Sequence, residues 1–257
     1  MPAVAVLTEG RSALGALRRA LPRGSTRVVT CRSVAQVRQL LTRRMSDAIV
    51  VSPRLVPPDQ LRALARDFPT IPVICFASFR PDDGELLHAC AGELDLPVAV
   101  EGVDDAVVGV LVTRIGATAR RQRAMAEAPR LLRLKSPLQL QVWEHVLTAG
   151  PGVLRTDAIA RRMRMSREHL SREFAMEAAP NLKRVIDLAR IAAAAQLLQN
   201  PAITAAVAAK LLGFASSSHL GIASRRVAGV PTSGLGALGP KGVLTAFARG
   251  GRGRSRV

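Results

Sequence analysis

The sequence predicts an α/β N-terminal domain built on a parallel sheet, followed by an all-α domain. Three observations indicate this division. Short apolar runs alternate with amphipathic stretches through the first 112 residues, helical periodicity alone prevails from Ser136 onward, and the charge of the two halves differs sharply. We expect the domains to span residues 1–112 and 136–238, with a basic helical linker at 113–135 and a disordered basic tail at 239–257.

The N-terminal elements follow one another in a regular order. Strands are expected at 4–7, 26–30, 48–51 and 73–76, and helices at 12–20, 34–42 and 60–67. Strands that alternate with helices form parallel sheets covered on both faces. The run Ala48-Ile-Val-Val51 has the continuous apolar character of a strand buried on both sides.

This order and spacing resemble the receiver domain of two-component response regulators, whose third strand ends in the phosphate-accepting Asp. Ser52 occupies that place here. The resemblance also implies an acidic pair after the first strand to hold Mg²⁺ and a Lys after the fifth, whereas this chain has Thr8-Glu9 and no Lys near Val98–Val100. Without the nucleophilic carboxylate, and with at most one metal-binding acid, aspartyl phosphorylation lacks its acceptor and its cation.

The N-terminal domain is therefore expected to be a pseudo-receiver, with another flavodoxin-like sheet as the alternative. Ligands of such sheets bind at the carboxyl ends of the strands, which places a candidate site near Thr8, Ser52 and Ser78. No residue pattern there names a ligand.

The basic residues are concentrated in the second half. Lys and Arg total 37 against 19 Asp and Glu; residues 1–112 hold 13 basic and 12 acidic residues, and residues 113–257 hold 24 and 7. Such an asymmetry indicates a polyanionic partner, since Lys and Arg near phosphates release condensed counterions. A membrane surface would require a basic helix with bulky apolar residues opposite, which is not seen after Thr113.

Aromatic residues are scarce: there is no Tyr, one Trp and six Phe. Proteins that bind single strands commonly stack bases on aromatic rings, so this composition favours duplex DNA over RNA.

The remaining composition predicts no cofactor, metal or catalytic centre. Cys31, Cys75 and Cys90 form no C-x-x-C pair, which argues against a disulfide framework or a zinc site. No nucleophile motif or Gly-rich phosphate loop is present, so the chain is not expected to be an enzyme. The apolar run at the N-terminus is too short for a signal peptide, and a cytoplasmic, nucleoid-associated location is expected.

Two short helices joined by a tight turn are predicted between Thr156 and Phe174. The small residue Ala160 lets the helices approach closely, and the turn falls at Arg164. Ser166 can cap the second helix, and Leu170 and Phe174 face the core. This is a helix-turn-helix unit. The residues expected to contact DNA here are Ser166, Arg167, Glu168, Ser171 and Arg172.

The pattern repeats about 49 residues later. Ala209 to Phe214 has the same spacing from small residue to turn, with Gly213 supplying the turn. A long Ala-rich helix from Leu182 to Gln199, stopped by Asn200-Pro201, separates the two units. The residues expected to contact DNA in the second unit are Ser216, Ser217, Ser218, His219, Arg225 and Arg226.

This half resembles the AraC family of bacterial regulators. The matching segments are Leu170–Phe174, Arg190, Ala194–Leu198, Leu212–Phe214, Ser218–Leu220 and Gly229–Pro231. The resemblance implies two helix-turn-helix units, joined by one helix, in successive major grooves on one face of the DNA. Eighteen helical residues span about 27 Å, and the flanking turns bring the separation near the ~34 Å of one duplex turn.

The second unit departs from the family pattern. Ile222 and Ser224 stand where the family carries an Arg and a Phe, and Thr232 stands where a Pro is expected. We therefore expect Arg167 and Arg172 of the first unit to read bases. The second unit would contribute mainly phosphate contacts, which supply affinity and register but little sequence discrimination.

The predicted function is a sequence-specific transcription regulator that binds double-stranded DNA. Its further candidate partners are a second copy, through the N-terminal domain, and RNA polymerase; a membrane is not expected. The alternative is a non-enzymatic interaction or scaffold protein that binds DNA without sequence preference.

Overall fold

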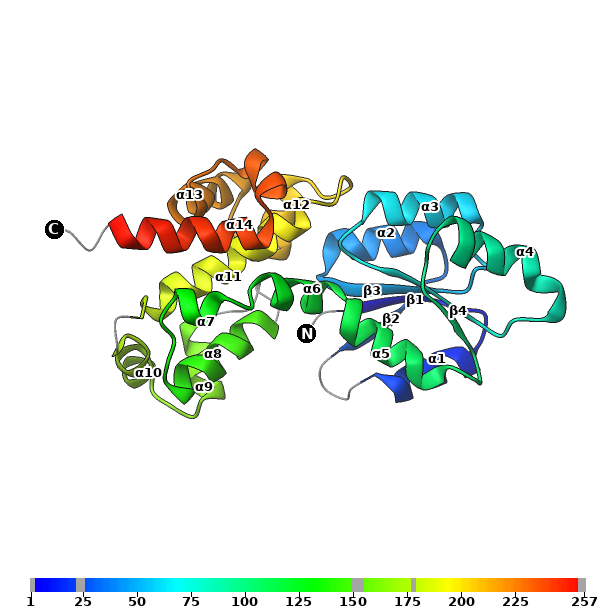
Figure 1. The fold of residues 1–257 in the computed structure, drawn as a ribbon, viewed down its shortest axis with the longest axis horizontal. Helices are drawn as coiled ribbons and strands as arrows, with labels where there is room; N and C mark the ends of the chain where they lie inside the picture. Colours follow the sequence, from blue (N-terminus) through cyan, green and yellow to red (C-terminus); the bar gives the residue numbers. More distant parts are fainter. Residues whose placement is uncertain (1–2, 22–25, 149–154, 177–178, 254–257) are drawn as a thin grey trace. The chain divides into compact units, whose positions relative to one another are not determined.

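A computed structural model describes residues 3–21, 26–148, 155–176 and 179–253 (Figure 1). The chain divides into two units, and the division between Arg120 and Arg121 falls inside the segment expected to be a linker. Each unit is considered by itself below.

The first unit is built on a five-stranded sheet. Its strands are β1 (Ala3–Leu7), β2 (Arg27–Thr30), β3 (Ser46–Val51), β4 (Val73–Ala77) and β5 (Val98–Val100). All neighbouring pairs are parallel and the strand order is β2-β1-β3-β4-β5. This is the flavodoxin-like order, so the predicted fold class of the N-terminal domain is confirmed.

Helices cover both faces of this sheet (Figure 1). One face carries α1 (Arg11–Ala20) and α5 (Asp105–Ile115), and the other carries α2 (Val34–Arg43) and α3 (Pro58–Asp67). Between β4 and β5 the chain forms the 3₁₀ turn η1 (Pro81–Asp83), α4 (Gly84–Leu87) and the π-helical turn η2 (His88–Glu93).

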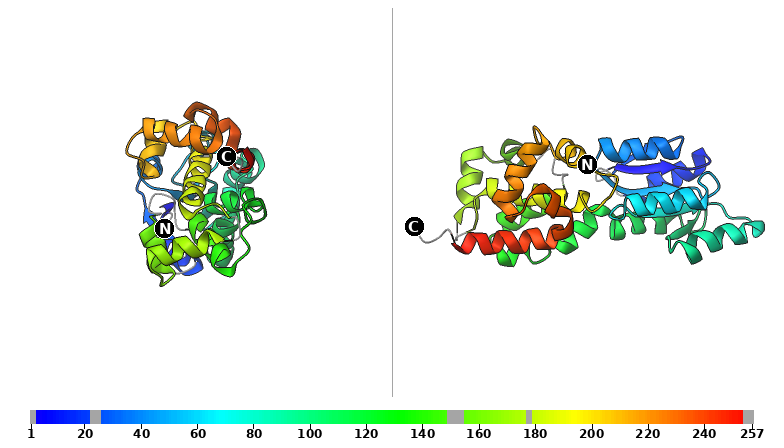
Figure 2. Two further views of the ribbon diagram at one scale, coloured as in Figure 1. Left: turned by 90° about the vertical axis from the view of Figure 1, so that its left-hand side faces the viewer. Right: turned by 90° about the horizontal axis from the view of Figure 1, so that it is seen from above.

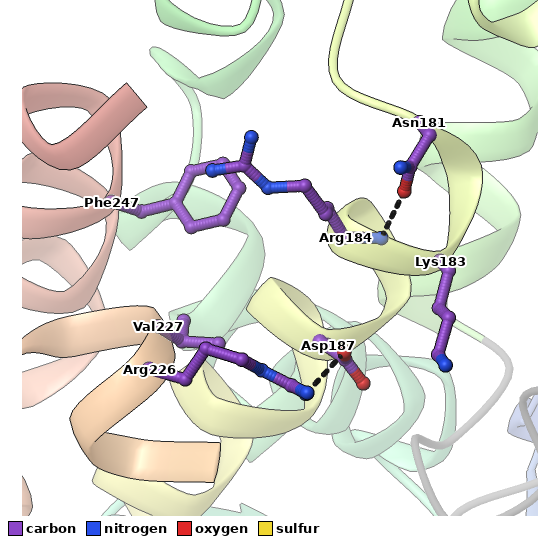
Figure 3. Close-up of a pocket in the computed structure, with 7 residues that line it drawn as sticks. All are labelled: Asn181, Lys183, Arg184, Asp187, Arg226, Val227 and Phe247. Atoms are coloured by element: carbon purple, nitrogen blue, oxygen red, sulfur yellow. Dashed lines mark hydrogen bonds and ion pairs between the residues drawn. The ribbon is translucent and has the colours of Figure 1, made fainter. Parts of the chain in front are cut away.

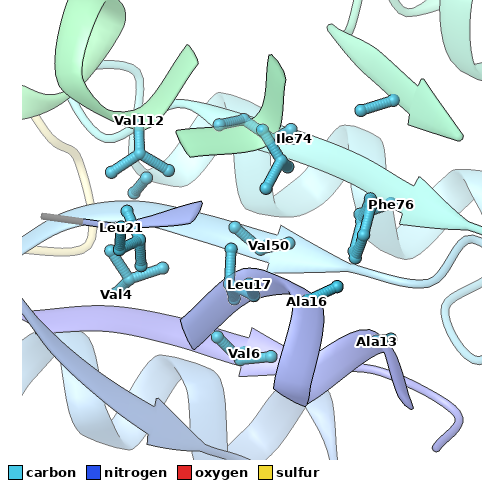
Figure 4. Close-up of a cluster of buried hydrophobic side chains, with 13 residues drawn as sticks. Val4, Val6, Ala13, Ala16, Leu17, Leu21, Val50, Ile74, Phe76 and Val112 are labelled. Carbon is cyan, nitrogen blue, oxygen red and sulfur yellow. The ribbon is translucent and has the colours of Figure 1, made fainter. Parts of the chain in front are cut away.

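Alternate strand residues form the core under α1 and α5 (Figure 4). Val4 and Val6 of β1, Val50 of β3, and Ile74 and Phe76 of β4 are at most 1% exposed. They pack with apolar residues of the two helices, among them Ala13, Ala16, Leu17, Val108 and Val112.

Helix α5 approaches α1 closely at one glycine. A Cβ on Gly109 would lie 2.2 Å from the carbonyl oxygen of Ala20, so only a residue without a side chain fits there.

The second unit is all-helical, as predicted. After α6 (Ala117–Ala124), which begins before the division, come α7 (Ala128–Leu131), α8 (Pro137–Thr148), α9 (Thr156–Arg162), α10 (Arg167–Phe174), α11 (Leu182–Leu197), α12 (Ala205–Leu211), α13 (Ser217–Ala228) and α14 (Thr232–Gly253). The long helix α11 is the centre of this unit. Its small residues Ala192 to Ala195 are completely buried, which lets neighbouring helices pack closely against it.

The prediction of a disordered tail from Gly239 onward is wrong for the residues that the structure describes. Helix α14 continues to Gly253 and is interrupted at Gly239, the residue before Pro240, where φ is +65°. Beyond this kink the helix runs along α11 (Figures 1 and 2). Val243, Leu244 and Phe247 lie on one side of the helix and are buried, so an apolar stripe stabilises a segment whose Gly and Arg content indicated disorder. Residues 254–257 lie outside the described residues.

Within the described ranges, no helix is long and apolar enough to cross a membrane.

Candidate nucleic-acid interface

The first helix-turn-helix unit consists of α9, α10 and the turn between them. The backbone N–H of Met165 donates to the carbonyl of Ala160 at 3.0 Å, which closes the turn around the end of α9. Arg164 adopts a left-handed conformation, with φ of +55°, at the position where the sequence predicted the turn. Non-glycine residues adopt this conformation uncommonly, so the turn is well defined by its surroundings.

Helix α10 starts and packs as predicted. The Ser166 hydroxyl accepts a hydrogen bond from the backbone N–H of His169 at 3.1 Å, which satisfies one of the free donors at the start of the helix. Leu170 and Phe174 are completely buried. The opposite face of α10 is therefore the one available to a partner.

The second unit, α12 and α13, repeats this geometry. The N–H of Phe214 donates to the carbonyl of Ala209 at 2.9 Å, and Gly213 has a φ of +68°. These three residues lie 49 positions after Met165, Ala160 and Arg164. The Ser216 hydroxyl accepts from the N–H of His219 at 3.2 Å and caps α13. The sequence repeat is thus a structural repeat.

The predicted contact residues of the first unit lie together on the outward face of α10. Arg167, Glu168 and Arg172 are exposed, and Ser171 is half-buried. The Arg167 Nε lies 3.7 Å from the Asp157 carboxylate, and an Nη of Arg172 lies 3.0 Å from Nδ1 of His169. Both arginine side chains therefore remain at the surface.

The second unit presents a different surface. All four residues at the start of α13 that were predicted to contact DNA are exposed: Ser216, Ser217, Ser218 and His219. Ile222, one turn after Ser218, is 60% exposed, and Arg225 follows on the same side of the helix. Arg226 instead forms an ion pair of 2.7 Å with Asp187 of α11. The structure therefore separates the two neighbouring arginines.

Ser224 has a structural role. It lies 50 residues after the buried Phe174 and is itself completely buried. Its hydroxyl donates to the carbonyl of Val230 at 2.6 Å, across the C-terminal end of α13, where Gly229 has a φ of +74°. The departure at Ser224 therefore changes the packing of the second unit and removes no outward-facing residue.

Gln139, which the sequence reasoning missed, fastens the end of α10. Its Oε1 accepts from the backbone N–H of Lys135 and of Ser136, and its Nε2 donates to the carbonyls of Phe174 and Met176 at 3.0 and 3.1 Å. Ser136 and Gln139 form a capping box at the start of α8, and the pattern Ser-x-x-Gln could have identified it. The contact with α10, 35 residues away, has no local signal.

Arg190 fastens the second unit to α11. Its Nε and an Nη donate to the carbonyl of Leu212, at 3.3 and 2.9 Å, and its guanidinium lies 3.9 Å from the centre of the Phe214 ring. Burial lowers the pKa of Arg190, against the opposing effect of Asp187, but an arginine remains charged. The side chain therefore satisfies a carbonyl at the end of α12 and holds the turn against α11.

The carboxyl ends of the strands in the first unit do not fit a Mg²⁺ site. The Arg54 guanidinium forms an ion pair with Asp83 and lies 3.7 Å from the Glu9 carboxylate. Its hydrogen bond is the main reason that the pKa of Asp83 lies below its usual range. Because the Arg54 guanidinium is paired with Asp83 and lies near Glu9, a metal ion bound by these acids would meet a positive charge beside them.

Ser52 lies beside this group at the end of β3. It is 1% exposed, and its hydroxyl has no hydrogen-bond partner among the described residues. Of the other two residues expected at this edge, Thr8 is half-buried and Ser78 is exposed. The described residues also contain no group of three His, Cys, Asp or Glu side chains arranged to hold a metal.

Comparison with solved structures gives three similar chains. The transcriptional regulator CdpR from Pseudomonas aeruginosa is 21% identical, with 70% of this chain and 61% of that chain covered and a TM-score of 0.35. Full-length FixJ from B. japonicum is 14% identical, with 88% and 96% covered and a TM-score of 0.37. The RcsB response regulator from Salmonella typhimurium is 15% identical, with 73% and 98% covered and a TM-score of 0.34.

Comparison with curated protein sequences gives no significant match. Comparison with protein families matches residues 159–235 to the family described as "Helix-turn-helix domain". The matched segment contains both closed turns and both helices that follow them. Residues 159–235 therefore match a helix-turn-helix domain, at the place where the sequence predicted both units.

Proposed function

We propose that this chain is a sequence-specific regulator of transcription that binds duplex DNA through both helix-turn-helix units. The observation that carries the proposal is the repeated turn, closed by Met165 to Ala160 in the first unit and by Phe214 to Ala209 in the second. Each turn leads into a serine-capped helix with an exposed polar face. The excess of basic residues from 113 onward favours a polyanionic partner.

The two units contribute unequally in this proposal. Arg167 and Arg172 are exposed on α10 and can form paired hydrogen bonds with a guanine edge in the major groove. On α13, Arg225 and Arg226 are both exposed, but Arg226 is paired with Asp187. The first unit would therefore carry most of the base recognition, and the second would mainly contact phosphates.

Selection of binding sites from random duplex DNA tests the proposal. We expect an enriched site with most of its sequence information in the half read by α10. Arg172→Ala should weaken binding to that site by about 1–3 kcal/mol and relax the sequence preference. Arg43→Ala, at an exposed position of α2, is the control and should bind as the wild type does.

Unchanged affinity and preference in Arg172→Ala would refute the assignment of that residue. No enriched sequence, together with steep salt dependence, would favour the scaffold protein with non-specific DNA binding, since phosphate contacts alone give that behaviour.

The N-terminal unit is proposed to be a receiver-like domain that is not phosphorylated. Ser52 stands at the position where a receiver domain has its nucleophilic carboxylate. Arg54 forms ion pairs with two acids at this edge of the sheet, Glu9 and Asp83. The test is intact-mass measurement after incubation with acetyl phosphate and Mg²⁺. We expect no mass increase; a phosphoryl group found on the N-terminal unit would overturn this part of the proposal.

The N-terminal unit is also proposed to form a homodimer. Val103, Val107 and Val110 are 80%, 45% and 48% exposed. Val107 and Val110 are three residues apart on α5 and share one side of it, and Val103 lies in the turn before the helix. Exposed apolar stripes of this kind are commonly covered by a partner. Two further expectations rest only on the proposed regulatory role. They are RNA polymerase as a partner and a cytoplasmic location at the nucleoid.

Sedimentation or light scattering measures the dimer. Val107→Glu with Val110→Glu should convert a dimer to a monomer, because two carboxylates would be desolvated in the interface. Leu55→Glu, at a position 46% exposed in the loop after β3, is the matched control and should leave the mass unchanged. A wild type that is monomeric at high concentration would refute the dimer.

A further inference from the structure

A cavity of about 210 Å³ lies between α11, α13 and α14 in the second unit (Figure 3). Lys183 and Arg184 of α11, Arg226 of α13 and Phe247 of α14 line it. An adjoining cavity of about 220 Å³ shares Arg184, Arg226 and Phe247 and adds Arg225. We call these two cavities together the α14 groove.

The charged residues that line the α14 groove are mostly basic. Four basic side chains line it, namely Lys183, Arg184, Arg225 and Arg226, and Asp187 is the one acidic residue in its lining. The Asp187 carboxylate is already paired with Arg226 at 2.7 Å. The groove therefore keeps an uncompensated positive charge that an anion can neutralise.

Arg184 is held in position by an aromatic ring. Its guanidinium lies 5.0 Å from the centre of the Phe247 ring, and Phe247 is 6% exposed. The cation–π contact uses no N–H group as a hydrogen-bond donor, and no described residue accepts a hydrogen bond from the Arg184 guanidinium (Figure 3). Phe247 lies beyond residue 235, where the match to the helix-turn-helix family ends. The feature therefore depends on a part of α14 that lies outside the matched segment.

The chemistry of the lining limits the ligand. The two cavities share lining residues, so their separate volumes of about 210 and 220 Å³ set no upper bound on its size, and the arginine donors decide its class. Planar N–H donors of arginine bind phosphate oxygens in pairs. We propose that the α14 groove binds a single phosphate group.

Two sources can supply this phosphate. One is the DNA backbone beside the second recognition helix, because Arg225 lies on the same side of α13 as the exposed Ile222 and also lines the groove. The other is a free phosphate ion or the phosphate of a small ester. The first source rests on the proposed function; the second does not.

The first experiment measures free phosphate. Thermal unfolding of the full chain is followed in sodium phosphate and in sodium chloride of equal ionic strength. If free phosphate enters the groove, the midpoint rises with phosphate concentration beyond the chloride value, as expected for a ligand that binds only the folded state. Arg184→Gln should lose this additional rise. Lys241→Gln, at an exposed position of α14 outside both cavities, should keep it.

The second experiment measures DNA. The slope of log affinity against log salt for a duplex should decrease in magnitude by about 0.9 in Arg184→Gln if one backbone phosphate contact is lost. Lys241→Gln should leave the slope unchanged. If Arg184→Gln does not fold, as judged by circular dichroism, Lys183→Gln takes its place, since that side chain is exposed and also lines the groove.

The two experiments separate the sources. A change in the DNA slope assigns the groove to the DNA backbone, and a phosphate-specific rise without that change assigns it to free phosphate. The proposal is overturned if the slope is unchanged and phosphate either stabilises no more than chloride or gives a rise that Arg184→Gln keeps in full, as expected for general stabilisation by phosphate. If the wild type binds no duplex, the proposed function fails, and the phosphate measurement alone decides the groove.

Discussion

Replacing Arg190 tests whether the second helix-turn-helix unit is held to α11 by one side chain. The guanidinium donates twice to the carbonyl of Leu212 and stacks on Phe214. Leu212 is completely buried, so its carbonyl would lose its charged donor without free access to water. Arg190→Met keeps the aliphatic part of the side chain and removes these interactions.

The expected cost follows from the geometry. A hydrogen bond from a charged donor contributes about 1.5–3 kcal/mol, and a cation–π contact about 0.5–2 kcal/mol, depending on desolvation. Because both hydrogen bonds share one acceptor, we count them once. Arg190→Met should therefore lower the free energy of unfolding by about 2–5 kcal/mol.

Urea unfolding followed by tryptophan fluorescence measures this change. Trp143 is the one tryptophan of the chain and is buried in α8, so its emission reports on the unit that contains Arg190. Arg190→Lys keeps the charge but loses the planar donors, and should behave more like Arg190→Met than like the wild type. Lys241→Met, at an exposed position, is the control. A loss below about 0.5 kcal/mol in Arg190→Met, the range of ordinary surface substitutions, would refute the reasoning.

Two further predictions concern packing and pH. Gly109→Ala should destabilise the N-terminal unit by about 1–3 kcal/mol in urea unfolding followed by circular dichroism, because the new Cβ would lie 2.2 Å from the Ala20 carbonyl oxygen. Gly84→Ala, where a Cβ meets no atom within 4 Å, should cost nothing, and equal behaviour of the two variants would contradict the prediction. Burial, and secondarily Arg162, lowers the pKa of His145, so the unfolded chain takes up a proton first as the pH falls below about 6.5. The contribution of His145 to the free energy of unfolding is complete above that pH and decreases as the pH falls toward the lowered pKa. His145→Gln should flatten this part of the curve of unfolding free energy against pH. An unchanged curve would show that His145 does not contribute to it.

Features that depend on neighbouring residues in the chain could be predicted from the sequence. The alternation of strands and helices, the serine cap at Ser166 and the turns at Arg164 and Gly213 all have local signals, and the structure has them where they were expected. The outward face of α10 then follows from helical periodicity once Phe174 is placed in the core.

Features that depend on distant residues could not be predicted. Arg54 meets Asp83 across 29 positions, and the Gln139 amide reaches Phe174 across 35, so neither contact has a periodic or compositional signal. The helix beyond Gly239 was missed for a related reason. Its glycines and arginines indicate disorder, and its apolar stripe gains stability only because α11 lies beside it.

Helix α11, with α14 packed along it, also bears on the spacing of the DNA sites that the chain can use. A helix of 16 residues has a length of about 24 Å and does not stretch, and α14 supports it along one side. One base pair added between two half-sites turns the second half-site by roughly 34–36° around the duplex axis, since a turn contains about 10–10.5 base pairs. If the distance between the two recognition helices is fixed, the DNA must twist or bend to bring both half-sites into contact with them. If both units bind one duplex as proposed, the protein therefore selects its sites by the distance between two half-sites as well as by their bases.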